Sequence, residues 1–298
     1  MMVTLDVKAP FSFAQTLTFV SRFAPCRDAC VMVDKALTSA VAIDGRAHAF
    51  TLREQRGGIV CEVADGTPAK IQRAIVEHAS RLIGAEDDIA PLYKAAAGDA
   101  AFSELVRELH GLHHVRFPTL ADSVVYSILM QRTPQKMAAA YKRKFLAALG
   151  HEIEIDGQTL HVMPELADIA ALDESDIAAA IGHKGKAERI STASRAVETI
   201  GEAFLRTASY EDARDALLEI NGIGPFAAAA ILLRGLGRMD ELPWMPQFER
   251  AAEALYGNAW GSSVDEETIT ERYGRHIGYW SFYVMTGVER RARATMSS

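Results

Sequence analysis

The residues with the clearest chemical potential form one short turn, Gly222-Ile223-Gly224-Pro225-Phe226. Two glycines around an apolar residue predict a tight turn between two helices, with positive φ at the glycines and Ile223 inserted between the helices. Pro225 is typical of the first position of a helix. The N–H groups of Gly222, Gly224 and Phe226 then lie at a helix N-terminus, where unpaired donors and the helix dipole attract anions such as phosphate. An ordinary helical hairpin without a ligand is the alternative.

A second group of cations could assist this turn. Lys184, Lys186 and Arg189 cluster in and after a glycine-containing loop and are expected to meet phosphates. The whole chain is acidic, with 32 Lys+Arg, 39 Asp+Glu and a net charge of −7 in 298 residues. Such a balance argues mildly against nonspecific polyanion binding. Local cations and a helix N-terminus decide the matter more directly than the total charge.

The elements that must position these groups fall into two parts. Residues 1–66 contain short β-type runs separated by turns such as Asp44-Gly45, with a helix at 11–23 that Ser12 could cap; a further helix is expected at 69–83. From residue 102 onward, almost every segment has helical periodicity, except for a hairpin or extended loop at 151–162. The sequence therefore predicts a mostly α protein, with an N-terminal α+β domain at 1–95 and a helical region at 96–298 that contains the hairpin at 210–238.

Membrane and cofactor signals are weak. No stretch approaches the roughly 20 apolar residues of a membrane span, and the first residues do not form a signal peptide, so a cytoplasmic protein is expected, associated with the nucleoid if bacterial. Three cysteines cannot supply the four thiolates of an iron–sulfur cluster. His110, His113 and His114 have no nearby carboxylate or cysteine to complete a site. We therefore expect no metal and no cofactor.

Residues 210–238 resemble the helix-hairpin-helix motif of the base-excision DNA glycosylase superfamily. The similarity extends to 115–118 and 123–133, to 164–167 and 173–190, and to 272–273 and 277–282. With the N-terminal α+β part included, the chain is similar to the three-domain DNA-3-methyladenine glycosylase II type over nearly its whole length. This resemblance implies a small antiparallel sheet with helices, followed by two packed helical subdomains.

Glycosylases pass through a transition state with oxocarbenium character, which a carboxylate stabilises while it orients the attacking water. The resemblance places Met245 at the position of the family's catalytic Asp, because Phe248 and Arg250 follow at matching intervals. A thioether cannot do this work, and Met245 is also a poor N-cap. Glu249, one helical turn later on the same face, and Asp240, before the turn, are the candidate replacements. The alternative is that Asp240 is a solvated loop charge and Glu249 an exposed helix residue.

The resemblance also assigns roles in base flipping. Phe226 stands where strand-nicking members carry a lysine, so no lyase activity is expected. Gln131 and Arg132 are candidates for the side chain that fills the gap left by a flipped nucleotide, with Thr133 contacting the backbone. The expected base pocket comprises Phe226, Trp244, Met245, Tyr273, His276, Tyr279 and Trp280.

Three functional hypotheses follow. The first is a monofunctional DNA N-glycosylase that acts as a monomer on double-stranded DNA with a damaged base, removes alkylated purines and needs no membrane. The second is a noncatalytic or impaired homologue that binds DNA or senses lesions, because the family Asp is Met245. The third is a helical protein whose pocket has been adapted to a small ligand or a protein partner.

Overall fold

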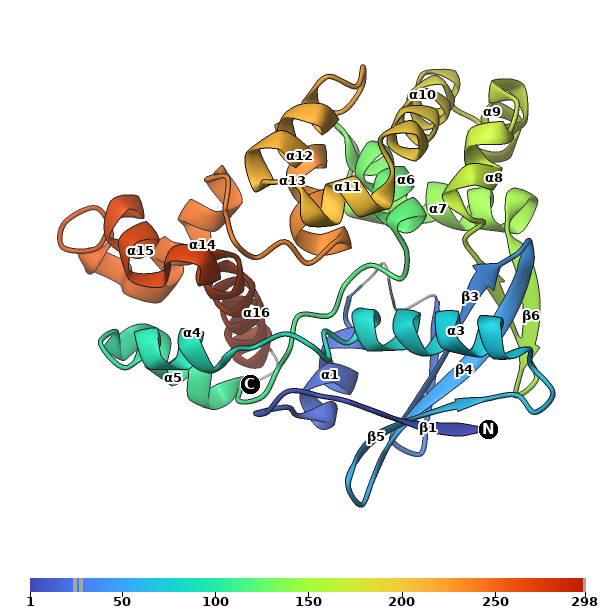
Figure 1. The fold of residues 1–298 in the computed structure, drawn as a ribbon. Coiled ribbons are helices and arrows are strands. Elements are labelled where there is room, and N and C mark those ends of the chain that lie inside the picture. Colours follow the sequence, from blue (N-terminus) through green and yellow to red (C-terminus); the bar gives the residue numbers. More distant parts are fainter. Residues whose placement is uncertain (24–25, 27–28, 297–298) are drawn as a thin grey trace.

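The computed structural model describes residues 1–23, 26 and 29–296. Within these residues, strands form a five-stranded antiparallel sheet in the order β1-β5-β4-β3-β2. Figure 1 shows the sheet at one end of the molecule, with helices above and beside it. The strands are β1 (Met2–Leu5), β2 (Cys30–Val33), β3 (Ala36–Ile43), β4 (Arg46–Gln55) and β5 (Gly58–Val63).

A two-residue turn fixes the centre of the sheet. Asp44 and Gly45 have φ values of 50° and 71° and connect β3 to β4, as is typical of an Asp-Gly hairpin turn. The resulting register places Leu37 opposite Leu52, and both side chains are completely buried. The turn predicted at Asp44-Gly45 is confirmed, and it determines which face of β3 and β4 enters the core.

Helices α1 (Phe13–Val20) and α3 (Ala69–Leu82) complete the N-terminal part. Ser12 accepts a hydrogen bond from the Gln15 amide, so its predicted role as the N-cap of the first helix is confirmed. α3 lies across the sheet (Figure 1) and buries Ile71, Ile75 and other apolar residues at helical spacing. The sheet and these two helices share one hydrophobic core.

The remaining helices form two groups around separate hydrophobic cores (Figure 1). The first group comprises α6 (Leu120–Met130), α7 (Gln135–Leu149), α8 (Leu166–Ala171), α9 (Glu174–Ile181), α10 (Lys184–Ile200), α11 (Glu202–Thr207), α12 (Tyr210–Leu218), α13 (Pro225–Ala229) and the π-helical segment η1 (Ala230–Gly235). The second comprises α4 (Ala90–Ala96), α5 (Ala100–Glu108), α14 (Pro246–Tyr256), α15 (Glu266–Tyr273) and α16 (Ile277–Met296), together with short 3₁₀ turns. The prediction of an N-terminal sheet followed by two helical subdomains is confirmed.

A small hairpin interrupts the helices, as predicted for residues 151–162. Strands β6 (His151–Ile155) and β7 (Gln158–Val162) pair antiparallel around a turn in which Asp156 and Gly157 have positive φ. β6 lies beside β4 (Figure 1), so this hairpin joins the helical part to the sheet.

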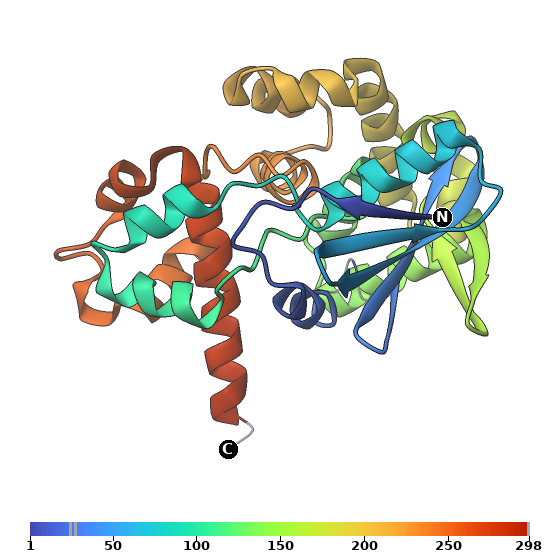
Figure 2. The same ribbon diagram turned by 60° about the horizontal axis from the view of Figure 1, so that its bottom comes forward.

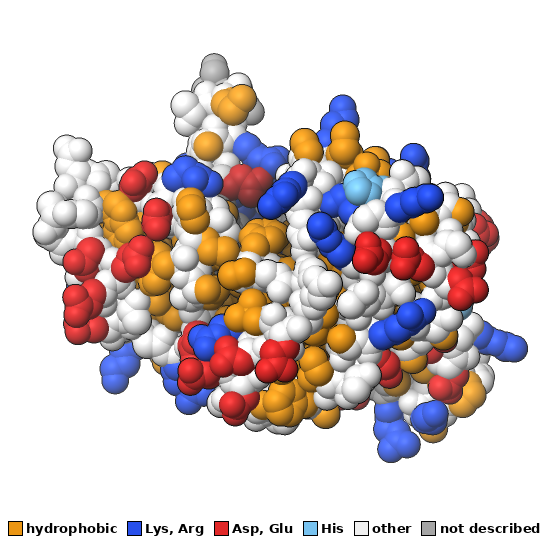
Figure 3. Space-filling model, turned by 90° about the horizontal axis from the view of Figure 1, so that it is seen from above, with side chains coloured by type: hydrophobic (Ala, Val, Ile, Leu, Met, Phe, Trp, Pro, Cys, Tyr) orange, Lys and Arg blue, Asp and Glu red, His pale blue; other side chains and the backbone are white. Residues whose placement is uncertain are grey.

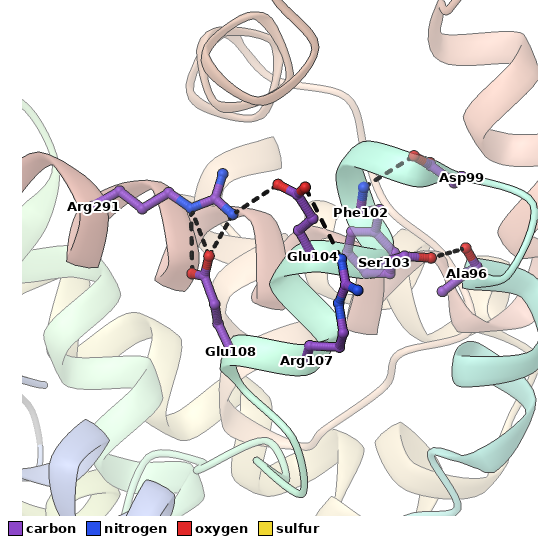
Figure 4. A network of polar contacts seen from close by, with 8 residues as sticks. All are labelled: Ala96, Asp99, Phe102, Ser103, Glu104, Arg107, Glu108 and Arg291. Atoms are coloured by element: carbon purple, nitrogen blue, oxygen red, sulfur yellow. Dashed lines mark hydrogen bonds and ion pairs between the residues drawn. The ribbon is translucent and has the colours of Figure 1, made fainter.

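Polar contacts hold α5 against the C-terminal helices. The Arg291 guanidinium of α16 pairs with Glu108 at 2.6 Å and with Glu104 at 3.8 Å on α5 (Figure 4). Asp99 caps α5 by accepting a hydrogen bond from the Phe102 amide. Leu92 and Ala96 of α4 pack in the hydrophobic core of the second helical group, although most of α4 lies before the predicted domain boundary. The boundary at residue 95 stays a prediction.

The three thiols of the chain are free and buried. Burial raises the pKa of Cys30 to about 11 and that of Cys61 to about 12, and it also raises the pKa of Cys26. Along the described part of the chain, we find no helix with the length and apolar character needed to cross a membrane. The last turns of α16 extend beyond the rest of the molecule (Figure 2).

Candidate functional site

The hairpin turn between α12 and α13 has the expected shape with one difference. Gly222 has a φ of +96°, and Ile223 is only 3% exposed between the helices, as predicted. Gly224 has a φ of −97° and a ψ of −179°, so the prediction of positive φ at this second glycine is wrong. An extended residue before Pro225 is what the proline ring requires sterically. Pro225 begins the helix at its first position, as predicted.

The turn offers donors to an anion. Among the described residues, the amides of Gly222, Gly224 and Phe226 have no hydrogen-bond acceptor. They lie at the N-terminal end of the continuous stretch formed by α13 and η1. Unpaired N–H groups at such an end, supported by the helix dipole, suit a phosphate oxygen.

The loop after α6 lies directly against this turn. Gln131 Nε2 donates a hydrogen bond of 2.6 Å to the carbonyl oxygen of Gly222, and Arg189 donates one of 3.2 Å to Gln131 Oε1. Thr133 Oγ1 donates to the carbonyl oxygen of Gln131. Arg132 is exposed and has a φ of +49°. The structure therefore brings together the loop and the hairpin that the sequence assigned to DNA, and leaves Arg132 projecting from them.

Lys184 and Lys186 have different environments although they are two residues apart. Lys184 is exposed at the start of α10. Lys186 is 4% exposed, and its Nζ donates hydrogen bonds of 3.0 to 3.1 Å to the carbonyl oxygens of Ile128, Leu129 and Gln131. Burial and the nearby Arg189 charge lower its pKa. Lys186 thus caps the C-terminal end of α6, where a cation also complements the helix dipole, and Lys184 is the one that faces solvent.

A cavity of about 1040 Å³ opens next to the hairpin. Side chains from α1, α6, α7, η1, α14 and α16 line it, and Phe226 of α13 belongs to its wall. From above, hydrophobic side chains gather in a hollow on this face, with Lys and Arg side chains around it (Figure 3). The aromatic part of the lining consists of Phe19, Phe23, Phe117, Phe226, Phe248, Phe282 and Tyr126.

The expected pocket residues are divided by the structure. Phe226 and Met245 line the cavity, whereas Trp244, Tyr273, His276, Tyr279 and Trp280 are not among its lining residues. Tyr273, Tyr279 and Trp280 are at most 4% exposed and belong to the core around α16. Their polar atoms are used there: Tyr273 donates to Asp99, Tyr279 to Asp87, and the Trp280 indole to Tyr256. The Trp244 ring is tilted against that of Trp260, with ring centres 6.0 Å apart. Burial and then the charge of the adjacent Arg275 lower the pKa of His276.

Met245 lies at the N-cap of α14 with an extended backbone, and its side chain accepts no hydrogen bond from a backbone amide of the helix; its Sδ accepts one of 3.6 Å from the Gln247 side chain. This confirms that the helix begins without a side-chain cap. The Asp240 carboxylate accepts two hydrogen bonds from the Arg238 guanidinium, at 2.9 and 3.1 Å. Glu249 lies near Glu266, whose pKa is raised by burial and then by the charge of Glu249. Neither Asp240 nor Glu249 lines the cavity. Glu289 of α16 supplies the one carboxylate among the described residues that line the cavity, and it pairs with Arg293 at 2.5 Å.

Sequence reasoning missed several polar residues of the cavity, among them Arg234 and His114. The Arg234 guanidinium carbon lies 4.8 Å from the Phe23 ring centre, 5.4 Å from that of Phe282 and 5.7 Å from that of Phe19. Burial lowers its pKa to about 10, so it stays charged at neutral pH. A signal existed in the sequence, because Arg234 is a lone charge within the apolar run 231–236.

The His114 ring is completely buried, and neither of its nitrogens has a hydrogen-bond partner among the described residues. Burial, together with the charges of Arg234 and Arg116, lowers its pKa well below the usual value, so the ring is neutral. His113, its neighbour, uses both ring nitrogens on the carbonyl oxygens of Gly84 and Pro10. No cluster of three or more metal-binding side chains occurs in the described part of the chain.

Known proteins resemble the chain over part of its sequence and in its fold. No family model matches the chain. Over 164 residues it is 28% identical to a DNA-3-methyladenine glycosylase of Bacillus subtilis; the match covers 54% of this chain and 54% of that protein, so it spans about half the length of this curated relative.

Two solved structures share the fold over almost the full length. The 3-methyladenine DNA glycosylase of Archaeoglobus fulgidus superposes with a TM-score of 0.76 at 19% identity, covering 96% of this chain and 97% of that one. The Clostridium acetobutylicum 8-oxoguanine glycosylase/lyase, solved with double-stranded DNA containing cytosine opposite 8-oxoG, superposes with a TM-score of 0.69 at 12% identity, covering 95% and 93%.

The sheet, the two helical groups and the hairpin beside a cavity define a helix-hairpin-helix DNA glycosylase fold. Over almost its whole length, the fold matches that of the 3-methyladenine DNA glycosylase of Archaeoglobus fulgidus.

Proposed function

We propose that the protein is a monofunctional DNA N-glycosylase of base-excision repair, which binds duplex DNA as a monomer and flips an alkylated purine into the cavity. One observation carries the proposal: Phe226 belongs both to the first turn of the hairpin's second helix and to the cavity wall. A strand held by the hairpin amides therefore has the cavity within reach of a flipped nucleotide. The likeness to the glycosylase of B. subtilis supports alkylated purines as the substrate class.

The other DNA contacts come from groups next to the hairpin. Lys184 is exposed and can pair with phosphate. Of the two candidates for the side chain that fills the gap, Gln131 is bonded to the hairpin and Arg132 is exposed, which favours Arg132. Thr133 lies in the same loop.

The chemistry expected is hydrolysis without strand cleavage. Phe226 is 43% exposed at the position where the family's strand-nicking members carry a lysine. A phenyl ring cannot form a Schiff base with the sugar, so the product is an abasic site.

Catalysis must proceed without an aspartate at residue 245, the position that resemblance assigns to the family carboxylate. Asp240 and Glu249 are the candidates nearest in sequence, and Glu289 is the candidate that lines the cavity. A purine alkylated at N3 or N7 is already cationic, and its glycosidic bond breaks with less assistance. A damage-binding protein without catalysis is the second candidate function, and the apolar Met245 side chain in the cavity lining favours it.

The experiment compares the parent with Met245→Asp, Glu249→Gln and Glu289→Gln on duplexes that carry 3-methyladenine or 7-methylguanine, measuring free base and abasic sites. We expect slow release by the parent and an increase on the order of a hundredfold for Met245→Asp, the size of a positioned general base. Loss of release in Glu289→Gln or Glu249→Gln identifies the carboxylate in use. Binding without release by the parent overturns the glycosylase proposal and leaves the damage-binding function.

A further inference from the structure

We propose that the cavity discriminates between purines by their 6-substituent, preferring a 6-oxopurine to a 6-aminopurine, and that Arg234 is the specificity-determining residue. This inference deepens the proposed function and rests on it, since it names the bases that the cavity accepts.

The first observation is an arginine without a direct polar partner in the described part of the chain, on which the Glu289 carboxylate acts only through its charge. Arg234 lines the cavity from η1, and its guanidinium is surrounded by the rings of Phe19, Phe23 and Phe282. It forms no ion pair or side-chain hydrogen bond with any described residue. Rings stabilise the faces of a guanidinium, but its N–H donors lie in the plane and need acceptors. An occupant with acceptor atoms satisfies them.

The second observation is independent and concerns another neighbour of the Phe282 ring. His114 packs edge-on against Phe282, with ring centres 4.8 Å apart, and is fully buried with both nitrogens unpaired among the described residues. A neutral imidazole offers one donor and one acceptor. Buried polar atoms are nearly always paired in native proteins, so an unpaired ring beside a cavity indicates a bound partner.

This combination matches one edge of one kind of base. A 6-oxopurine presents an acceptor at O6 beside a donor at N1, whereas adenine presents a donor at N6 beside an acceptor at N1. Arginine has only donors and is suited to O6, alone or together with N7 when N7 is unmodified. An amino group at position 6 places donor against donor and leaves the guanidinium unsatisfied.

The contact with O6 acts on alkylated and unmodified bases alike. The preference for the oxo substituent should therefore hold for hypoxanthine over adenine and for alkylated guanines over alkylated adenines.

The same contact assists departure of the base. Hydrolysis breaks the C1′–N9 bond with its electron pair left on the purine, while water adds to C1′ and its proton ends on the base. In a 6-oxopurine the added electron density reaches O6, where a fixed guanidinium stabilises it. Arg234 thus acts on the leaving group, whereas the carboxylate missing at residue 245 acts on the sugar.

The test measures binding, so that it does not depend on catalysis. Duplexes contain a single 2′-fluoroarabino nucleotide that resists hydrolysis and carries hypoxanthine or adenine, opposite an abasic-site analogue so that pairing does not contribute. We expect the parent to bind the hypoxanthine duplex about tenfold to a hundredfold more tightly, the discrimination given by one good bidentate contact. Arg234→Met should remove the preference, and Arg234→Lys, which keeps the charge without the fork, should reduce it.

Arg22→Met is the matched control, because it removes an exposed arginine of the rim; it should weaken binding of both duplexes alike and keep their ratio. Equal binding of the two duplexes by the parent overturns the inference, whichever variants fold, and so does a preference that survives in folded Arg234→Met. Base release without a preference removes only the inference. A preference without release from natural nucleotides leaves the inference intact and removes the glycosylase activity.

Discussion

The side-chain amide of Gln131 donates a hydrogen bond of 2.6 Å to the carbonyl oxygen of Gly222, which joins the loop after α6 to the hairpin turn. Lys186 adds to this connection, since its Nζ donates hydrogen bonds to the carbonyl oxygen of Gln131 and to that of Ile128 near the end of α6. The loop and the hairpin therefore form one rigid unit before any DNA is bound. Preorganisation of this kind reduces the entropy lost on binding.

The two hairpin glycines should respond differently to an added methyl group. A Cβ at Gly222 would lie 3.0 Å from Arg189 Cγ in a backbone with a φ of +96°. We expect Gly222→Ala to lower the free energy of unfolding by about 1–2 kcal/mol and to weaken DNA binding, because a left-handed conformation is strained for alanine. Urea unfolding and fluorescence anisotropy with duplex DNA measure the two effects.

Gly224→Ala is the matched control for this prediction. Its backbone is extended, and an added Cβ meets no atom within 4 Å. The stability of Gly224→Ala should stay within about 0.5 kcal/mol of the parent. A larger loss for Gly224→Ala than for Gly222→Ala would contradict the geometry of the turn.

Lys184 and Lys186 provide a second pair of opposite outcomes. Lys186→Met removes three hydrogen bonds and leaves the buried Leu129 carbonyl oxygen without a donor from the described residues, whereas Ile128 keeps the Gln131 amide and Gln131 keeps the Thr133 hydroxyl. We expect a loss of about 1–3 kcal/mol in the free energy of unfolding. Lys184→Met, at an exposed site, should leave stability nearly unchanged and should weaken DNA binding in a salt-dependent manner. Thermal unfolding and binding titrations at two salt concentrations separate the effects; equal stability of both variants would refute the capping role of Lys186.

Sequence patterns predicted the elements well because local rules determine them. The Asp44-Gly45 turn, the Ser12 cap and the hairpin at 151–162 each depend on neighbouring residues. The interior of the cavity depends on distant ones. Tyr273 and Trp280 have the right chemistry for a base pocket but face the core, and Arg234 and His114 meet at Phe282 although they come from residues more than 100 positions apart. Periodicity identifies which residues are buried without identifying which cavity they face.

Asp99 should be worth more than an ordinary helix cap. Its carboxylate is 5% exposed and accepts hydrogen bonds from the Tyr256 and Tyr273 hydroxyls, at 2.6 and 2.9 Å, besides the α5 amide. We expect Asp99→Ala to reduce the free energy of unfolding by about 3 kcal/mol, since the buried Tyr273 hydroxyl and the half-buried Tyr256 hydroxyl lose their acceptor, Arg272 loses its ion pair, and α5 loses its cap. Calorimetry checks this value.

Asp265 is the corresponding control. It caps α15 at an exposed position through the Thr268 amide. Asp265→Ala should lower the free energy of unfolding by only about 1 kcal/mol. If both substitutions had the same effect, the tyrosine contacts of Asp99 would contribute nothing.

His114 should make the fold sensitive to acid. Its pKa is held well below the unfolded value of about 6.5, so the unfolded chain binds an additional proton below that pH. The free energy of unfolding is unaffected by this histidine above about pH 6.5. Below that pH it decreases, with a slope approaching about 1.4 kcal/mol per pH unit. Urea unfolding between pH 7 and 5 should show a smaller slope for His114→Phe than for the parent.

A variant of the exposed His110, His110→Gln, accompanies this measurement as the control. An unchanged slope in His114→Phe would show that other groups govern the loss of stability in acid.

The low reactivity of the buried thiols is relevant to the proposed substrate. Electrophiles that methylate purines also attack cysteine, and they do so through the thiolate. With pKa values of about 11 and 12, Cys30 and Cys61 are ionised at neutral pH in fewer than about one molecule in a thousand, and Cys26 is shielded in the same way. The thiols of the chain should therefore react only slowly with methylating agents. The protein can keep its structure under the same conditions that produce alkylated purines, its proposed substrate.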